Sequence, residues 1–307
     1  MPLDSDVAEL VRALAETGAP AMSEGTVAEA RRNYDAAPRP APDPLPHVVD
    51  RVIESDGLSV PVRCYAPVAD PRDLPVIVFF HGGGWVLSSV DGHDPTARRL
   101  ALMTGALVVS VEYRLAPEHP FPAAHDDCWA VTEWVSREAA SIGGDPNRIA
   151  VAGDSAGGNL AAGVAVRARD EGLALRHQCL IYPCVDTEQD PYPSMTENSE
   201  GYFLTAADMV WFWDRYVPDQ HRGDPRAVPA RLDDATRLAP ALVLTAEYDP
   251  LRDEAERYAD RLSEAGVQVE MVRMPGVVHG FVTRWHTMAR ALEAHEVISA
   301  ALRRALS

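Results

Sequence analysis

The stretch Gly153-Asp154-Ser155-Ala156-Gly157 limits the possible folds of this chain more than any other feature. The apolar run 149–152 before it has the length of a buried strand, and the alanine-rich run 156–169 after it has helix-forming composition. A strand that turns directly into a helix holds the residue at the bend in a strained conformation, and flanking glycines let the two elements converge. The pattern therefore predicts an exposed, nucleophilic Ser155 at the end of a strand.

Strands and helices are expected to alternate along the chain. A hairpin is expected to begin the sheet, from residues 48–54 and 58–67 joined through Asp56-Gly57. Continuous apolar runs predict buried strands over residues 76–80, 106–111, 149–152, 179–183, 241–246 and 267–274. Helical patterns cover residues 96–103, 126–140, 156–169 and 251–265, the first with Asp94 as N-cap and Pro95 in its first turn. This alternation is typical of a doubly wound, mostly parallel α/β sheet, whose ligand sites lie at the carboxyl ends of the strands.

The run His81-Gly82-Gly83-Gly84-Trp85 directly follows the expected strand 76–80. Successive glycines allow a turn whose backbone N–H groups point outward into a cleft. Acyl transfer needs such donors, because each one fixed in place stabilises the oxyanion of the tetrahedral intermediate by about 3 to 4 kcal/mol. We therefore expect an oxyanion hole at this turn. Because Gly83 and Gly84 carry no Cβ, we also expect room beside it for a branched alcohol, into which the indole of Trp85 could swing.

An acid and a base follow later strands of the expected sheet. Asp249 comes after the strand 241–246, and His279 comes after the strand 267–274. With Ser155 they stand in the order Ser, Asp, His, which the α/β-hydrolase plan requires. Asp253 is the alternative acid, but it lies one turn inside a helix, so we favour the loop position Asp249, which can reach a neighbouring loop.

Residues 186–231 interrupt the alternation of strands and helices. Within them Met209, Phe212, Trp213 and Tyr216 recur at helical spacing, which predicts a helix with one apolar face. Such a helix can simply pack on the core. An insertion between strands can also cover a cleft, and we expect this one to act as a lid.

Aromatic residues near the glycine turn and in the insertion are the expected lining of a substrate pocket: Trp85, Tyr202, Phe203, Trp211 and Phe212. A pocket with such walls is finite, and each buried CH₂ adds only about 0.8 kcal/mol, so we expect the acyl preference to fall above roughly eight carbons. Two helical stretches, 5–16 and 24–34, precede a proline-rich connector and are expected to pack as an accessory piece.

Charge and composition exclude several classes of function. The chain carries 28 basic and 46 acidic residues, a net charge of −18, which repels nucleic acid and anionic membranes at long range. All of the basic residues are arginines, because the sequence contains no lysine. A Walker phosphate loop, a pyridoxal Schiff base and a Ser-x-x-Lys nucleophile are therefore excluded.

Cysteines and histidines give no metal or disulfide pattern. Cys64, Cys128, Cys179 and Cys184 are scattered without Cys-x-x-Cys spacing, and we expect idle or buried thiols in a reducing compartment. No His-Glu-x-x-His motif occurs, so no metal site is expected. Apolar runs are shorter than the roughly 18 to 20 residues of a membrane span, and the acidic N-terminus differs from a signal peptide. We expect a cytoplasmic protein with no membrane partner.

Together these motifs resemble those of bacterial esterases of the hormone-sensitive lipase family, within the α/β-hydrolases. The matching stretches cover the chain almost from end to end: residues 81–85, 113–118, 153–159, 201–205, 249–253 and 279–281. The resemblance implies a single α/β-hydrolase domain over residues 1–307. In it a helical cap, formed by residues 1–45 and 186–231, would cover a catalytic core of residues 46–185 and 232–307.

The resemblance also implies which residues act. It assigns the triad to Ser155, Asp249 and His279, and the oxyanion hole to the N–H groups of Gly83, Gly84 and Ala156. It implies a small-molecule carboxylic ester with a short to medium acyl chain as substrate, no cofactor, and homodimers that pair through an edge strand. Rival functions are an amidase or lactonase using the same triad, and a non-catalytic small-molecule receptor such as the plant relatives that have lost the histidine.

Overall fold

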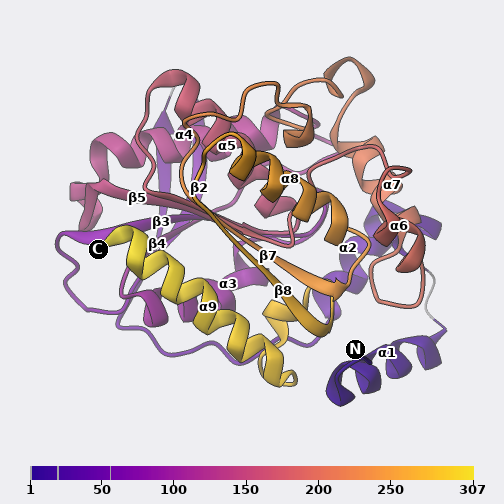
Figure 1. Ribbon diagram of the computed structural model, residues 1–307. Coiled ribbons are helices and arrows are strands. Elements are labelled where there is room, and N and C mark those ends of the chain that lie inside the picture. Colours follow the sequence, from indigo (N-terminus) through magenta and orange to yellow (C-terminus); the bar gives the residue numbers. More distant parts are fainter. Residues whose placement is uncertain (1, 19–20, 56) are drawn as a thin grey trace.

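The computed structural model describes residues 2–18, 21–55 and 57–307. An eight-stranded sheet crosses the molecule in the order β1-β2-β4-β3-β5-β6-β7-β8 (Figure 1). The strands are β1 (His47–Ser55), β2 (Leu58–Ala66), β3 (Leu74–Phe80), β4 (Leu107–Val111), β5 (Gly144–Asp154), β6 (His177–Ile181), β7 (Ala241–Tyr248) and β8 (Val269–Val278). β2 pairs antiparallel with β1 and β4, and all other neighbours are parallel. The expected α/β class with a mostly parallel sheet is confirmed.

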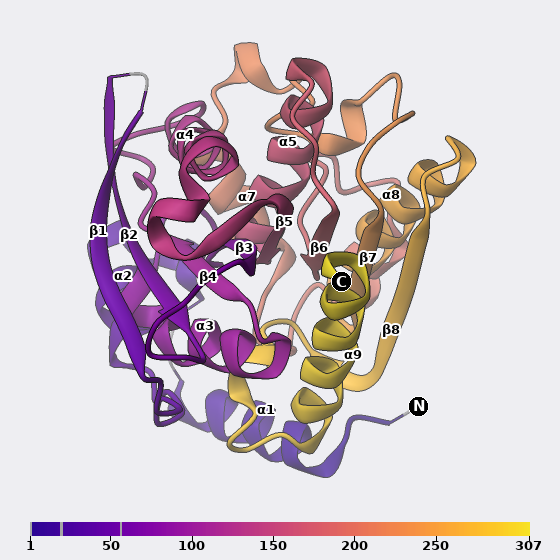
Figure 2. The ribbon, with the colours of Figure 1, turned by 90° about the vertical axis from the view of Figure 1, so that its left-hand side faces the viewer.

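Helices cover both faces of this sheet (Figures 1 and 2). On one face lie α3 (Val90–Thr104) and α9 (Ala289–Leu306), and on the other lie α4 (Ala123–Glu138), α5 (Ala156–Glu171) and α8 (Arg252–Glu264). The remaining helices are α1 (Ser5–Thr17), α2 (Val27–Ala36), α6 (Pro193–Glu197) and α7 (Ala206–Tyr216). Figure 1 shows α2, α6 and α7 gathered on one side of the molecule, near the ends of β7 and β8.

The central strands are buried on both faces, as their uninterrupted apolar sequences predict. In β3, Val76, Val78 and Phe80 pack into one layer of the core, while Ile77 and Phe79 pack into the other. All five side chains are fully buried. Each such side chain stabilises the fold by about 1.5 to 3 kcal/mol relative to an exposed position, so β3 anchors both layers.

The hairpin that begins the sheet forms as expected. Ser55 at the end of β1 pairs with Leu58 at the start of β2. Asp56, the first residue of the predicted Asp-Gly turn, lies outside the described residues.

The start of α3 corrects the expected cap at Asp94. The helix begins at Val90, and the side chain of Ser89 accepts the N–H of Gly92 at 3.1 Å as its N-cap. Asp94 instead lies inside the helix and accepts hydrogen bonds from Tyr65 at 3.0 Å and Arg98 at 2.7 Å. The Asp94-Pro95 pair is typical of a helix start, but Ser89, five residues earlier, supplies the oxygen that caps the helix.

Other boundaries shift for local reasons. A capping box between Thr26 and Glu29 starts α2 at Val27, three residues later than expected. β8 begins at Val269, two residues later than expected. It continues to Val278, because its pairing with β7 resumes after an irregularity. The apolar face predicted for the insertion is confirmed, since Met209, Phe212, Trp213 and Tyr216 of α7 are all buried.

In the parts of the chain that the structure describes, no helix has both the length and the apolar composition needed to span a bilayer. All four cysteines are free and buried, as their scattered positions predict.

Candidate active site

Ser155 occupies the sharp bend between β5 and α5. Its φ of 57° and ψ of −119° lie in a region that non-glycine residues rarely adopt, which is the strain expected of such a turn. A Cβ on Gly157 would lie 1.9 Å from the carbonyl oxygen of Phe80, and one on Gly153 would lie 2.2 Å from that of Gly157. Both glycines are therefore required for the close approach of helix and strand, as the sequence predicted.

The structure brings Ser155, His279 and Asp249 into one hydrogen-bonded chain. The Oγ of Ser155 lies 2.9 Å from Nε2 of His279, and Nδ1 of His279 lies 2.6 Å from Oδ2 of Asp249. Asp249 is completely buried and His279 is 6% exposed, whereas Ser155 is only partly buried. A hydroxyl that can meet a ligand is thus linked through an imidazole to a carboxylate shielded from water.

Contacts around Asp249 hold its carboxylate in place. Oδ1 accepts the N–H of Leu251 at 2.9 Å, which leaves Oδ2 for the imidazole. The side-chain amide of Asn198, at the end of α6, donates to the Asp249 carbonyl oxygen at 3.1 Å. Asn198 is buried and comes from the insertion, so no spacing in the sequence pointed to it.

Asp253, the alternative acid, is engaged elsewhere. Its Oδ2 accepts the N–H of Ser194 at 2.8 Å, and its Oδ1 pairs with Arg252 at 2.7 Å. The Oγ of Ser194 in turn donates to the Pro250 carbonyl oxygen at 2.7 Å. Asp253 therefore ties the insertion to the start of α8 and makes no contact with the imidazole of His279.

The glycine turn lies against the bend that carries the serine. Its first N–H, that of Gly82, donates to Oδ1 of Asp154 at 3.0 Å. Within the described residues, no protein acceptor takes the N–H groups of Gly83 and Gly84. The N–H of Ala156 is the first in α5 and has no partner within the helix. These three donors are free to bind an anionic oxygen.

A buried polar network beneath the glycine turn was missed by sequence reasoning. The hydroxyl of Tyr113 donates to the His81 carbonyl oxygen at 2.7 Å. Nε2 of His93 lies 3.3 Å from Oδ2 of Asp154, and its Nδ1 lies 3.0 Å from Oγ of Ser88. Burial lowers the pKa of His81 to about 3, so this imidazole is neutral at physiological pH. The members come from separate segments, and only folding brings them together.

The room expected beside Gly83 and Gly84 is already filled by protein. A Cβ on Gly84 would lie 2.2 Å from Cδ1 of Phe212, and one on Gly83 would lie 2.3 Å from the Leu87 carbonyl oxygen. Both glycines also have positive φ, 60° and 119°. The prediction of an open space was wrong. It assumed that the absence of a Cβ leaves empty volume, but α7 and the loop itself occupy that volume.

Trp85 packs away from solvent. Its ring is fully buried, lies parallel to Tyr216 at 4.3 Å between centroids, and contacts Trp213 at 4.4 Å. This packing anchors the glycine turn to α7. It corrects the expectation that Trp85 lines the pocket or swings toward the substrate, because its ring has no accessible surface.

The other expected pocket residues differ in accessibility. Trp211 and Phe212 are buried, with 7% and 4% of their surface exposed. Tyr202 is half-buried with its ring 5.0 Å from that of Tyr248. Phe203 is 36% exposed, and its ring edge lies 3.6 Å from the position of a Cβ on Gly280, the neighbour of His279. Phe203 therefore presents an exposed aromatic surface near the imidazole.

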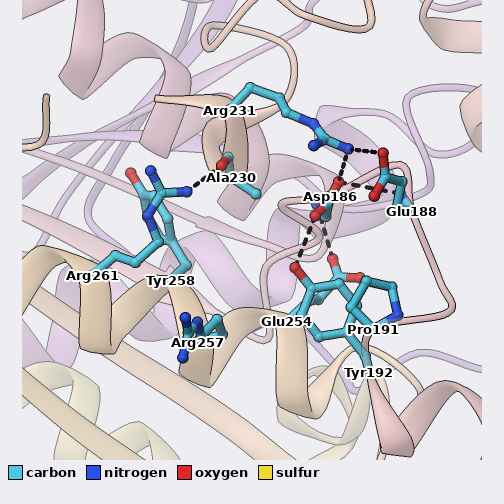
Figure 3. A pocket seen from close by; sticks show the side chains of 10 residues that line it. All are labelled: Asp186, Glu188, Pro191, Tyr192, Ala230, Arg231, Glu254, Arg257, Tyr258 and Arg261. Carbon is cyan, nitrogen blue, oxygen red and sulfur yellow. Dashed lines mark hydrogen bonds and ion pairs between the residues drawn. The ribbon is translucent and has the colours of Figure 1, made fainter. Parts of the chain in front are cut away.

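A separate cavity of about 330 Å³ lies between the insertion and α8 and is lined by none of the triad residues (Figure 3). Three of its charged side chains bond to one another, and others bond to the backbone. Arg231 contacts Asp186 at 3.1 Å and Glu188 at 2.6 Å, and Glu254 accepts the N–H of Val185 at 2.6 Å. Burial raises the pKa of Glu254 well above its ordinary value. These bonds fasten the insertion to the core.

Known proteins share this architecture. A family model described as alpha/beta hydrolase fold matches residues 77–283. Carboxylesterase NlhH of Mycobacterium tuberculosis is 46% identical over 273 residues, which cover 86% of this chain and 85% of the relative. The chain belongs to the hormone-sensitive lipase family of α/β-hydrolases. The hyperthermophilic esterase of the archaeon Pyrobaculum calidifontis superposes on this hydrolase with a TM-score of 0.92 at 41% identity, over 99% of each chain.

The family of this hydrolase also contains a receptor. Gibberellin receptor GID1 of Oryza sativa subsp. japonica is 36% identical over 243 residues, which cover 76% of this chain and 66% of the receptor. Relatives named carboxylesterase or esterase, together with the esterase structures, nevertheless show that this chain is a serine carboxylic-ester hydrolase. Which residues carry out the reaction must be argued from the site.

Proposed function

We propose that this serine carboxylic-ester hydrolase acts through a triad of Ser155, His279 and Asp249. The observation that carries the proposal is the hydrogen-bonded chain from the serine Oγ through the imidazole to the buried carboxylate, at 2.9 Å and 2.6 Å. Nucleophile, base and orienting acid lie at the carboxyl ends of three parallel strands, where α/β folds place ligands.

The proposed mechanism follows from this chain of contacts. Nε2 of His279 removes the proton from Ser155 as Oγ attacks the ester carbonyl carbon. Asp249 holds the imidazole in the productive tautomer and stabilises its charged form. The imidazolium then protonates the departing alcohol, and water hydrolyses the acyl-enzyme by the same steps in reverse.

The oxyanion of each tetrahedral intermediate is proposed to bind the N–H groups of Gly83, Gly84 and Ala156. Two features support this role. The N–H groups of the two glycines have no acceptor among the described residues, and Ala156 begins a helix whose dipole favours negative charge. Donors fixed before the reaction need no reorganisation as charge develops.

The proposed substrates are esters with short to medium acyl chains, taken up beneath a cap formed by residues 1–45 and 186–231. The burial of Trp211 and Phe212 supports this range. These aromatic side chains of α7 pack within the protein and therefore do not line an open channel for a long acyl chain. The test is a series of p-nitrophenyl esters of increasing acyl length. We expect kcat/KM to fall above roughly eight carbons, since each added CH₂ gains at most about 0.8 kcal/mol and only while the pocket has room. A steady rise toward long chains would contradict a closed pocket.

Two rival functions are separable by experiment. An amidase or lactonase would use the same triad, so an ester and an amide of one acyl group should be compared; we expect the ester to react far faster. A non-catalytic receptor would bind such compounds without turnover. The presence of His279 at 2.9 Å from Ser155 favours catalysis. Homodimerisation through an edge strand stays a prediction, which light scattering can check.

A further inference from the structure

Arg284 is an unpaired cation close to the active site. It ends the short 3₁₀ helix Phe281–Arg284, five residues after His279. Its side chain is half-buried, yet it makes no hydrogen bond or ion pair with any residue that the structure describes. Other arginines without such a bond in the described ranges are all exposed: Arg12, Arg32, Arg51, Arg237 and Arg257. A partly desolvated cation without a partner is costly, which points to a partner supplied by a ligand.

Ring contacts place the guanidinium beside the triad. Its central carbon lies 5.2 Å from the centroid of Phe203, whose ring edge is 3.6 Å from the Cβ position of Gly280. Gly280 directly follows His279 in the chain. The cation is therefore a neighbour of the proposed base rather than a distant surface group.

The guanidinium group itself offers a matched pair of donors. Its planar fork of N–H groups fits the two oxygens of a carboxylate, which guanidinium groups bind in bidentate fashion. The hydroxyl of Tyr182 does not contribute to such a site, because it is buried without accessible surface.

We propose that Arg284 forms an anion subsite, which makes this hydrolase selective for esters that carry a carboxylate near the scissile bond. The inference rests on the proposed esterase function and specifies its substrate class. The selectivity must come from local contact, because the net charge of −18 repels anions at long range.

The test compares charged and neutral partners of the same ester. One pair is 3-acetoxybenzoate and its methyl ester, with the carboxylate on the alcohol side. The other pair is monophenyl succinate and methyl phenyl succinate, with the carboxylate on the acyl side. The readout is the ratio of kcat/KM for the charged ester to that for the neutral ester, in which any loss of folded enzyme cancels.

Substituting Arg284→Met should lower this ratio by about 10- to 100-fold in at least one pair, the size expected for losing a charge-assisted hydrogen bond. Arg284→Lys should give an intermediate ratio, because it keeps the charge without the fork. Arg257→Met is the matched control: it removes the same charge from an exposed, unpaired position in α8 and should leave the ratio unchanged.

The outcomes separate the two proposals. If the wild type hydrolyses neither the charged nor the neutral ester of either pair, the esterase assignment itself fails. If neutral esters react but the ratio in both pairs is the same in wild type and Arg284→Met, the subsite is overturned while the esterase assignment stands. An equal fall in Arg257→Met would also overturn the subsite, because the effect would then be one of overall charge.

Discussion

The backbone N–H of Gly82 donates to the carboxylate of Asp154 at 3.0 Å, across 72 positions of sequence. Asp154 immediately precedes Ser155, so this bond joins the glycine turn to the bend that carries the nucleophile. The fit is tight, because a Cβ on Gly82 would lie 2.5 Å from the other carboxylate oxygen. The spacing between the proposed oxyanion donors and the serine hydroxyl thus depends on one buried carboxylate.

Replacing the Asp154 carboxylate with an amide should make the free energy of unfolding depend less on pH in the acid range. Burial alone would raise the pKa of Asp154, but the imidazole of His93 and the N–H of Gly82 hold it below its ordinary value. The ionised group therefore stabilises the fold above the unfolded pKa of about 4, and this contribution is lost as pH falls through the lower folded pKa. Asp154→Asn should cost about 1.5 to 3 kcal/mol at neutral pH.

Urea unfolding of wild type and Asp154→Asn at several pH values measures this difference. We expect the gap between the two free energies of unfolding to narrow as pH is lowered below about 4. A gap that stays constant down to the acid limit would show that the carboxylate is not ionised in the folded protein.

Removing the nucleophile should abolish turnover and leave the fold intact. Ser155→Ala deletes only the hydroxyl, and we expect kcat to fall by on the order of 10⁶-fold. An aryl phosphonate should label wild type at Ser155 alone, as peptide mass spectrometry would detect. Labelling of another serine would overturn the assignment.

Two aspartates at the start of α8 provide a matched pair of variants. Asp249→Asn should reduce kcat by on the order of 10⁴-fold, because an amide permits the wrong tautomer of His279. Asp253→Asn should retain most activity and lose about 1 kcal/mol of stability, since the Asp253 carboxylate bonds to Ser194 and Arg252 and, among the described residues, not to His279. Steady-state kinetics and thermal melting distinguish the two, and a large kinetic loss in Asp253→Asn instead would reassign the acid.

The packing of Phe212 against Gly84 predicts poor turnover of tertiary-alcohol esters. The ring occupies the volume beside the glycine, so a tert-butyl ester should react far more slowly than its n-butyl counterpart. Phe212→Ala should raise the ratio of tert-butyl to n-butyl hydrolysis, at a cost of about 3 to 5 kcal/mol in stability. Trp211→Ala is the control, because that ring packs under the guanidinium of Arg215 at 3.7 Å. An equal gain in both variants would show that general loosening of α7, not the ring itself, admits the branched group.

Local patterns were sufficient for the fold class and for the members of the proposed triad. The glycines beside Ser155 are required, because a Cβ on Gly157 would lie 1.9 Å from a carbonyl oxygen. The strand-end positions of Asp249 and His279 follow from the length of each apolar run. Such features depend on neighbours in the chain, or on the rule that parallel strands end at one edge. The sequence by itself therefore determined which groups meet at that edge.

Contacts between distant segments were decided by tertiary structure alone. Three of these contacts join residues that share no local sequence pattern. They are the bond from Gly82 to Asp154, the bond from the Asn198 amide to the Asp249 carbonyl, and the packing of the Phe212 ring against Gly84. The open pocket expected at the glycines failed for the same reason, since whether a missing Cβ leaves space depends on what packs there. Likewise, one arginine among 28 becomes a candidate subsite because burial, not sequence, leaves it without a partner.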